Sequence, residues 1–285
     1  MGQSTIAEME LFDETCFKCS ELTTSQYSTS FSKGIKAFDK RFRYPVHAIY
    51  GFVRLADEIV DTLHQHNQRK LLESFRAETF AAIHQKISLN PILQAFQQTV
   101  HNYDIEEELI SDFLDAMEKD LVHKNYDADG YRQYIYGSAE VVGLMCLRIF
   151  CEGDEVLYLQ LQLHARSLGA AFQKVNFLRD VKADMEERGR RYFPGVDFNN
   201  FTAGDKEQIE NDILTDFEHA LAGIKLLPQG TRAGVYIAYV YYHRLFKKIC
   251  RLPPSVILHN RVRISDTLKL FLYLQAIFRQ KLKLV

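Results

Sequence analysis

The chain has 285 residues, of which 47% are hydrophobic and 25% charged, and its formal net charge is -2. This balance is typical of a globular protein with a sizeable core and excludes an intrinsically disordered chain. A nucleic-acid partner, which would leave a strongly basic footprint, is not expected.

Apolar residues recur at every third and fourth position through most of the chain, and strand signals are nearly absent. The predicted helices cover residues 10–33, 46–64, 67–87, 91–103, 106–120, 129–151, 155–187, 206–226, 231–251 and 265–283. Pro45 is expected to open one helix, and Pro253-Pro254 to separate the last two. Since no linker or repeat divides the chain, the sequence predicts one all-α domain over residues 1–285.

Two predicted helices have unusual interiors. The segment from Tyr134 to Leu147 is apolar nearly all round and contains Gly137 and Gly143, and residues 168–173 are likewise small and apolar. A helix that is apolar on every side is buried in the middle of a bundle. A glycine inside a helix costs ~1 kcal/mol relative to alanine. Either close helix packing or room for a long, thin apolar ligand would account for these glycines.

The first acidic pair is Asp57 and Asp61, four residues apart on a predicted helix. Both carboxylates therefore project from one helix face, with roughly 5–6 Å between their Cβ atoms. Like charges at this spacing mildly destabilise a helix, so the pair favours a bound cation. Arg54 lies on the same face one turn earlier. Alone, such a pair is more often a solvated surface.

The second pair, Asp180 and Asp184, repeats this spacing and follows Gln173 and Asn176 on the same helix. That polar face continues into the small apolar segment, an arrangement that suits a ligand with a charged head and an oily tail. Carboxylate and amide oxygens without clustered His or Cys suit Mg²⁺, with Mn²⁺ as an alternative. Mg²⁺ commonly takes its remaining ligands from substrate phosphates. Basic residues near the two pairs would supply further positive charge: Arg54, Arg179, Arg188, Arg190 and Arg191.

The five cysteines are expected to be reduced, because the first residues show no signal-peptide pattern. Cys16 and Cys19 form a C-x-x-C without a second ligand pair, so buried thiols are preferred to a zinc site. No stretch resembles the ~20 uncharged apolar residues of a membrane span. We therefore expect a cytoplasmic protein, and a peripheral contact with a membrane surface remains open.

Five segments in chain order resemble the squalene/phytoene synthase family, and together they are highly specific. They are Tyr27-Ser28-Thr29-Ser30-Phe31, then Tyr50-x-x-x-Arg54-x-x-Asp57-x-x-x-Asp61, then Tyr134 with Ser138 to Gly143, then Gln173-x-x-Asn176-x-x-Arg179-Asp180-x-x-x-Asp184 with Arg191-Tyr192-Phe193-Pro194, and last Tyr241 with Arg261. The resemblance implies an isoprenoid-synthase helical bundle around a central cavity. It also implies head-to-head condensation of two prenyl diphosphates through a cyclopropylcarbinyl diphosphate.

The resemblance assigns roles to particular residues. Mg²⁺ would be held by Asp57, Asp61, Asn176, Asp180 and Asp184. Catalysis would involve the four aspartates together with Tyr50, Arg54, Tyr134 and Tyr241. Substrate would be bound by Ser28, Ser30, Phe31, Gln173, Asn176, Arg179, Tyr192 and Arg261. A dry aromatic cavity formed by Phe31, Tyr50, Tyr134, Phe172 and Tyr241 would protect the cation from water.

The chain departs from the family pattern at Glu140, where the family usually has glycine. Glu140 either points to the polar end of the cavity or is a paired buried carboxylate. Ile35 and His47 stand at positions that tend to be bulkier in members with shorter substrates. They favour two geranylgeranyl diphosphates and phytoene, a step of carotenoid biosynthesis, over a thirty-carbon product from farnesyl diphosphate: dehydrosqualene, presqualene diphosphate or squalene. NADPH, which squalene formation needs, is not expected.

Two rival hypotheses remain. Head-to-tail elongases and terpene cyclases share the fold, but elongases generally carry Asp-Asp-x-x-Asp, whereas this chain has Glu58 after Asp57. A non-catalytic assembly or binding relative would typically have lost the metal-binding aspartates, and all four are present here.

Overall fold

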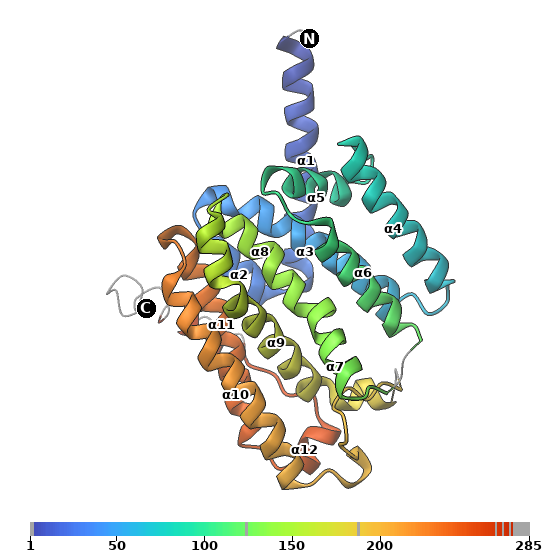
Figure 1. Cartoon of the computed structure of the whole chain (residues 1–285), viewed down its shortest axis with the longest axis vertical. Helices are drawn as coiled ribbons and strands as arrows, with labels where there is room; N and C mark the ends of the chain where they lie inside the picture. The colour runs from blue at the N-terminus through green and yellow to red at the C-terminus, as the bar shows by residue number, and fades with distance from the viewer. Residues whose placement is uncertain are drawn as a thin grey trace.

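The structure, a computed structural model, describes residues 3–122, 125–186, 189–265, 267–269, 271–273 and 275. Most of these residues are helical, and the helices pack side by side in a bundle (Figure 1). Among the described residues the β-bridges are limited to one isolated pairing of Asn125 with Arg191. The chain is all-α, as its periodicity predicts.

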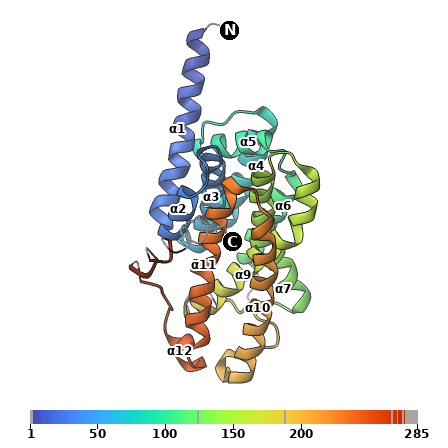
Figure 2. The same ribbon diagram turned by 90° about the vertical axis from the view of Figure 1, so that its left-hand side faces the viewer.

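The helices are α1 (Gln3–Tyr27), α2 (Thr29–Lys36), α3 (Lys40–Asp61), α4 (Gln68–Gln85), α5 (Pro91–Asn102), α6 (Glu107–Asp120), α7 (Ala128–Ile135), the π-helical η1 (Tyr136–Glu140), α8 (Val141–Cys151), α9 (Glu155–Glu186), the short 3₁₀ turn η2 (Phe198–Asn200), α10 (Ala203–Leu226), α11 (Gln229–Cys250) and α12 (Pro254–His259). The longest, α9, packs against η1, α8, α10, α11 and α12. The first helix, α1, extends beyond the body of the molecule at its N-terminal end (Figures 1 and 2).

The predicted helix 10–33 is two helices in the structure. Ser28 has an extended backbone, with φ -145° and ψ 102°, and its side chain accepts a hydrogen bond from the Phe31 amide. A serine in this geometry caps a new helix, so the chain turns between α1 and α2. Pro45 was predicted to open a helix, but α3 begins five residues earlier, at Lys40, and includes Pro45. Pro45 cannot donate a hydrogen bond to the Arg41 carbonyl four residues earlier.

The predicted helix 129–151 consists of α7, η1 and α8 without a break between them, and the α-helical hydrogen bonding becomes π-helical at η1. Such π-helical turns are rare and often lie at functional sites. Glu140, the last residue of η1, accepts a hydrogen bond from Arg166 Nε at 2.6 Å, and its side chain is 15% exposed. The second alternative for Glu140 is therefore the one observed: it is a paired, largely buried carboxylate.

Ala128–Cys151 is the one stretch of the described chain that is long and apolar enough to cross a membrane, judged by length and composition alone. The expectation concerned a span without charges, and this stretch carries Asp129, Arg132, Glu140 and Arg148. In the structure 56% of its apolar window is buried, and η1 and α8 pack against α6 and α9. A core helix passes the same test of length and composition.

The C-terminal elements differ in part from those predicted. The short helix α12 was not predicted, because Pro253-Pro254 was interpreted as a separator. Pro254 is instead the first residue of α12, a position that proline favours. Of the predicted helix 265–283, residues 267–269, 271–273 and 275 are helical, and residues 276–283 lie outside the described part of the chain.

His47 is not among the residues that line the cavity, contrary to expectation. Its side chain is buried, with 3% of its surface exposed, and Nδ1 lies 2.9 Å from the Thr24 hydroxyl of α1. That hydroxyl donates to the Ser20 carbonyl, which assigns His47 Nδ1 as the donor to Thr24. Burial lowers the pKa of His47 to about 4. The imidazole is therefore neutral in the folded protein at neutral pH.

This lowered pKa predicts a stability effect at mildly acidic pH. Between the ordinary histidine pKa of 6.5 and the folded value of about 4, the unfolded chain binds more protons at His47. The free energy of unfolding should therefore fall by about 3 kcal/mol as the pH drops through that window. His47→Gln lacks this titration, so urea denaturation should show its stability relative to wild type improving by that amount from pH 7 to pH 4. His66→Gln, at an exposed histidine, is the control; a pH-independent difference for His47→Gln would contradict the account.

Candidate active site

A cavity of about 600 Å³ lies between α2, α3, η1, α8, α9, α10 and α11. Helix α9 contributes one face along most of its length, from Leu161 at one end to Asp184 at the other. Close-packed backbones and the cavity occur together at its wall: Gly143 lines it, yet a Cβ there would lie 2.7 Å from the Ala165 carbonyl oxygen of α9. Close packing against α9 therefore accounts for Gly143, and room for a ligand stays a prediction.

The two ends of the cavity differ in chemistry. The acidic side chains gather at one end: Asp57, Asp61, Asp120, Asp180 and Asp184. The other end is apolar, with Ile35, Phe38, Val46, Phe150, Leu227 and Val235. Along α3, residues 57 and 46 are about 17 Å apart at 1.5 Å per residue. The cavity therefore suits a ligand with a charged head and a long apolar tail.

The first acidic pair lies at the C-terminal end of α3. Burial and, to a smaller extent, the neighbouring Asp61 together raise the pKa of Asp57 to about 7. Asp61 accepts a hydrogen bond from Arg190 Nη1 at 2.8 Å. Arg54 lines the cavity beside them, where it pairs with Glu58. The two carboxylates thus lie close together and partly out of water, and a cation bound between them would stabilise their ionised forms.

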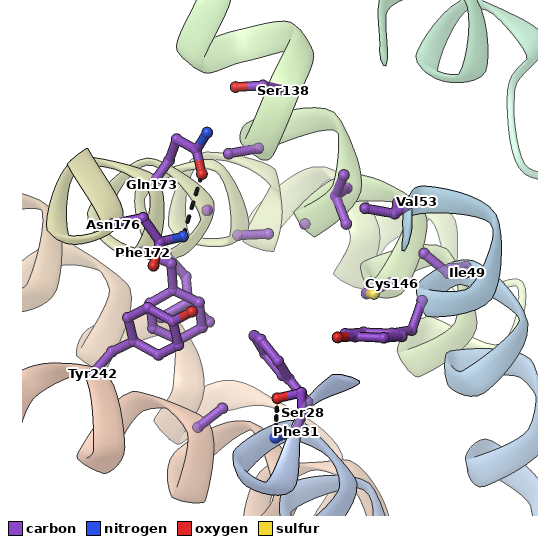
Figure 3. Close-up of a pocket in the computed structure, with 18 of the residues that line it drawn as sticks. Ser28, Phe31, Ile49, Val53, Ser138, Cys146, Phe172, Gln173, Asn176 and Tyr242 are labelled. Atoms are coloured by element: carbon purple, nitrogen blue, oxygen red, sulfur yellow. Dashed lines mark hydrogen bonds between the residues drawn. The ribbon is translucent and has the colours of Figure 1, made fainter. Parts of the chain in front are cut away.

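The second pair lies near the C-terminal end of α9. Asp180 is held by Arg179, with Nε 3.1 Å from the carboxylate, and by Arg261, with Nε 2.7 Å away. Asp184 is 6% exposed. Asn176 Nδ2 donates to Gln173 Oε1 at 3.4 Å, and both side chains project from α9 (Figure 3). The two pairs and this amide pair share one end of one cavity.

The donor set at this end fits a hard divalent cation. Asn176 Oδ1 is buried and has no hydrogen-bond partner within the described structure. A buried oxygen without a donor is costly and is what a metal ligand looks like before metal is bound. No group of three or more His, Cys, Asp or Glu among the described residues is arranged to hold a metal alone. An ion here would complete its shell with water and substrate phosphate oxygens, as Mg²⁺ usually does.

Aromatic rings follow the acidic end along the cavity. Phe31 packs against Tyr50, Phe172 and Tyr242, with ring centroids 5.8, 6.3 and 5.9 Å apart. Burial raises the pKa of Tyr50 to about 12, and its hydroxyl hydrogen-bonds with Ser28. The Phe31, Phe172 and Tyr242 rings meet from α2, α9 and α11 (Figure 3). Their faces form an aromatic stretch next to the charged end.

Asp120, the last residue of α6, is a cavity residue that the sequence interpretation missed. Its Oδ2 accepts a hydrogen bond from the Tyr134 hydroxyl at 2.8 Å, and burial raises its pKa to about 7. The sequence did contain an indication that Asp120 is buried. Leu109, Phe113 and Met117 form the apolar stripe of this helix, and residue 120 continues that stripe with a carboxylate. A charged residue on a buried stripe calls for a partner or a function.

The structure places fourteen of the predicted site residues in the cavity wall. They are Ser28, Phe31, Tyr50, Arg54, Asp57, Asp61, Tyr134, Gln173, Asn176, Arg179, Asp180, Asp184, Tyr192 and Arg261. Two predicted residues are not among the lining residues, Ser30 and Tyr241. Arg191 is exposed, its neighbour Arg190 lines the cavity, and Arg188 lies outside the described residues.

Tyr242 takes the place predicted for Tyr241. The Tyr241 hydroxyl donates to the Lys269 carbonyl at 2.7 Å, away from the cavity. Tyr242 stacks on Phe172 with ring centroids 3.9 Å apart, and its hydroxyl interacts with Asn176 and Arg179. Adjacent residues on a helix point about 100° apart, so a shift of one position selects the other face. Ser30 misses the cavity for the same reason, since residues 28, 31 and 35 share one face.

Comparison with known proteins agrees with this geometry. The profile of the family described as squalene/phytoene synthase matches residues 24–267. A 4,4'-diapophytoene synthase from Staphylococcus haemolyticus is 27% identical over 215 residues, 73% of this chain and 72% of that protein. A phytoene synthase from Cereibacter sphaeroides is 26% identical over 253 residues, 79% of this chain and 69% of that protein.

Solved structures show the same fold. A dehydrosqualene synthase in complex with ligand superposes with a TM-score of 0.81 at 22% identity, covering 94% of this chain and 98% of that one. Squalene synthase HpnC from Alicyclobacillus acidocaldarius gives a TM-score of 0.72 at 19% identity, covering 84% and 94%. The fold is thus the isoprenoid-synthase bundle that the resemblance implied. The chain belongs to the squalene/phytoene synthase family, whose typically Mg²⁺-dependent prenyltransferases join two prenyl diphosphates head to head.

Proposed function

We propose that this protein is a phytoene synthase that condenses two molecules of geranylgeranyl diphosphate, with Mg²⁺ as its metal and Mn²⁺ as a possible substitute. The observation that carries the proposal is the cavity itself. Both aspartate pairs line its charged end, and a continuous apolar wall leads away from them. A prenyl diphosphate has the matching form, a diphosphate head on a long hydrocarbon chain.

The residues divide the chemistry between them. Mg²⁺ held by the four aspartates and Asn176 would assist departure of diphosphate as a Lewis acid. Arg54, Arg179 and Arg261 line the same end and would pair with the diphosphate oxygens as negative charge develops. The aromatic faces beyond them would exclude water and stabilise the allylic cation. The double bond of the second substrate would then attack the cation, and loss of a proton from the resulting carbocation would close the ring of the cyclopropylcarbinyl diphosphate.

The choice of a twenty-carbon substrate rests on the cavity wall. The relatives named diapophytoene synthase and phytoene synthase match this chain about equally well, so identity does not choose between them. Ile35 lies in the wall with 3% of its surface exposed, at a position that tends to be bulkier in members with shorter substrates. The alternative is a thirty-carbon synthase that uses farnesyl diphosphate.

The direct test is incubation with Mg²⁺ and either geranylgeranyl or farnesyl diphosphate, each with and without NADPH, followed by mass analysis of the products. We expect phytoene from geranylgeranyl diphosphate, whether or not NADPH is present. A thirty-carbon product alone would overturn the chain-length assignment. Absence of a condensation product from both substrates would overturn the enzymatic proposal and favour a binding or assembly relative.

A larger side chain at Ile35 should shift the substrate preference. Ile35→Phe fills part of the apolar wall, so the kcat/KM ratio of geranylgeranyl to farnesyl diphosphate should fall about tenfold, within the range that hydrophobic pockets achieve. Ile35→Val, which removes one methyl group, is the matched control and should not penalise the longer substrate. Competition between the two substrates measures the ratio. An unchanged ratio in Ile35→Phe would show that this wall does not set chain length.

We also propose a cytoplasmic location, with peripheral membrane contact when the apolar product leaves. Cell fractionation followed by a salt wash would test it; recovery of the protein only in detergent-soluble material would contradict it.

A further inference from the structure

Arg190 connects the two acidic helices from the loop that follows α9. Its side chain is 7% exposed, and Nη1 donates to Asp61 Oδ1 at 2.8 Å and to the Tyr192 hydroxyl at 3.4 Å. Nη2 donates to the Val60 carbonyl at 3.4 Å, and the Arg190 amide donates to the Asp184 carbonyl at 2.7 Å. One buried cation thus ties the end of α3 to the end of α9.

Asp120 faces the same guanidinium from α6. Its Oδ1 lies 3.8 Å from Arg190 Nη1, beyond hydrogen-bonding distance, while Oδ2 is held by the Tyr134 hydroxyl. Oδ1 is buried and has no hydrogen-bond partner in the described part of the chain. A polar oxygen buried without a hydrogen-bond partner is costly and requires an explanation. The carboxylate is placed to receive a donor that now lies about 1 Å too far away.

The two acids compete for one arginine. Asp61 is also a ligand of the metal in the proposed function, and a metal ion and a guanidinium on the same carboxylate would repel each other. Metal on Asp61 would therefore weaken the hold of that carboxylate on Arg190. The contacts of Arg190 with Tyr192 and Val60 limit how far its side chain can move. The acceptor without a partner beside the guanidinium is Asp120 Oδ1.

We propose that Arg190 is a built-in counter-ion that neutralises Asp61 in the metal-free protein and transfers to Asp120 when Asp61 engages metal and diphosphate. Asp120 is a positioning residue: it sets metal affinity by accepting the displaced arginine and does not itself bind the ion. This inference rests on the proposed metal site. It adds that Arg190 is displaced from Asp61 when the metal binds there.

The test is a double-mutant cycle that measures Mn²⁺ affinity in the presence of inorganic diphosphate by electron paramagnetic resonance. Asp120→Asn keeps an acceptor for Tyr134 but loses the charge that receives Arg190, so Mn²⁺ should bind about tenfold more weakly. Arg190→Gln removes the competitor, so Mn²⁺ should bind more tightly. In the Arg190→Gln background, adding Asp120→Asn should change the affinity by no more than about twofold. Glu118→Gln, an exposed neighbour on α6, is the control and should leave the affinity unchanged.

Two results would overturn the proposal. If Asp120→Asn weakens binding as much without Arg190 as with it, Asp120 acts on the metal directly through its charge. If wild type does not bind Mn²⁺ with diphosphate at all, the proposed metal site fails and this inference fails with it.

A crystal structure of wild type with Mg²⁺ and diphosphate provides a check that does not depend on the variants folding. Arg190 Nη1 should then lie within about 3 Å of Asp120 Oδ1 and no longer contact Asp61. An Arg190 that remains on Asp61 in that complex would overturn the proposal.

Discussion

Asp57→Asn and Asp180→Asn should each lower the rate of condensation about a thousandfold or more and leave the helical fold intact. Each substitution keeps the shape of the side chain and removes one of the charges that would hold the metal. Loss of a single charge-stabilising group typically lowers a rate by about a hundredfold to a thousandfold, and a metal ligand serves the diphosphates of both substrates. Product mass analysis measures the rate, and circular dichroism the fold.

Asp57→Asn carries a second expectation that separates function from stability. Burial raises the folded-state pKa of Asp57 to about 7, so the folded protein takes up a proton there as the pH falls from 7 towards 4. Above pH 7 the ionised carboxylate therefore costs stability in the metal-free protein. Asp57→Asn should be at least as stable as wild type at pH 8, although it is inactive.

Asp129→Asn is the control for both substitutions, because Asp129 lies on the surface of α7 with 78% of its side chain exposed. Its activity should equal that of wild type. Retained activity in both Asp57→Asn and Asp180→Asn would mean that the two pairs are only charged surface, and the proposed metal site would have to be abandoned.

Gly169→Ala should lower the free energy of unfolding by about 2 kcal/mol, the scale of an overpacked contact. A Cβ at this position would lie 2.4 Å from the Ala139 carbonyl oxygen and 3.1 Å from the Glu140 Cα. Both are backbone atoms of η1, so they cannot move without displacing the cavity wall. The intrinsic gain of alanine over glycine in a helix, ~1 kcal/mol, opposes this loss only in part. Urea denaturation measures the net change.

Gly204→Ala, in the first turn of α10, is the matched control. The nearest atom to a Cβ there is Thr202 Oγ1 at 3.7 Å, an ordinary contact. This variant should be as stable as wild type or more stable, by up to ~1 kcal/mol. If the two alanine variants behave alike, α9 and η1 do not pack as closely as described.

The spacing of apolar residues predicted most helices well, because a helix that buries one face carries apolar residues at every third or fourth position. The breaks were harder to predict. The residue pattern on both sides of Ser28 is compatible with one continuous helix. The break between α1 and α2 is seen only in the structure, where the Ser28 side chain caps α2 by accepting a hydrogen bond from the Phe31 amide. The π-helical turn Tyr136–Glu140 cannot be predicted from the pattern of apolar residues, because an α-helix and a π-helix would both bury this segment.

The motifs located the acidic end because their four-residue spacing fixes both members of a pair on one face. Lone residues gave no such constraint. Tyr241 and Tyr242 are equally aromatic, and only the rotation of α11 decides which one enters the cavity. His47 is not among the residues of α3 that line the cavity, and its side chain instead lies against Thr24 of α1. Asp120 belongs to no motif, and its role depends on Arg190, seventy residues further along the chain.

The central claim is that the charged end of this cavity joins two copies of one prenyl diphosphate head to head. The most direct measurement is incubation with Mg²⁺ and geranylgeranyl diphosphate as the sole prenyl substrate, with quantification of both the condensation product and inorganic diphosphate. Head-to-head condensation to a hydrocarbon joins both chains and releases two diphosphates for each product. We expect that ratio, and its loss when the metal is chelated. A condensation that requires added isopentenyl diphosphate, or release of diphosphate with only prenyl alcohol, would contradict the account.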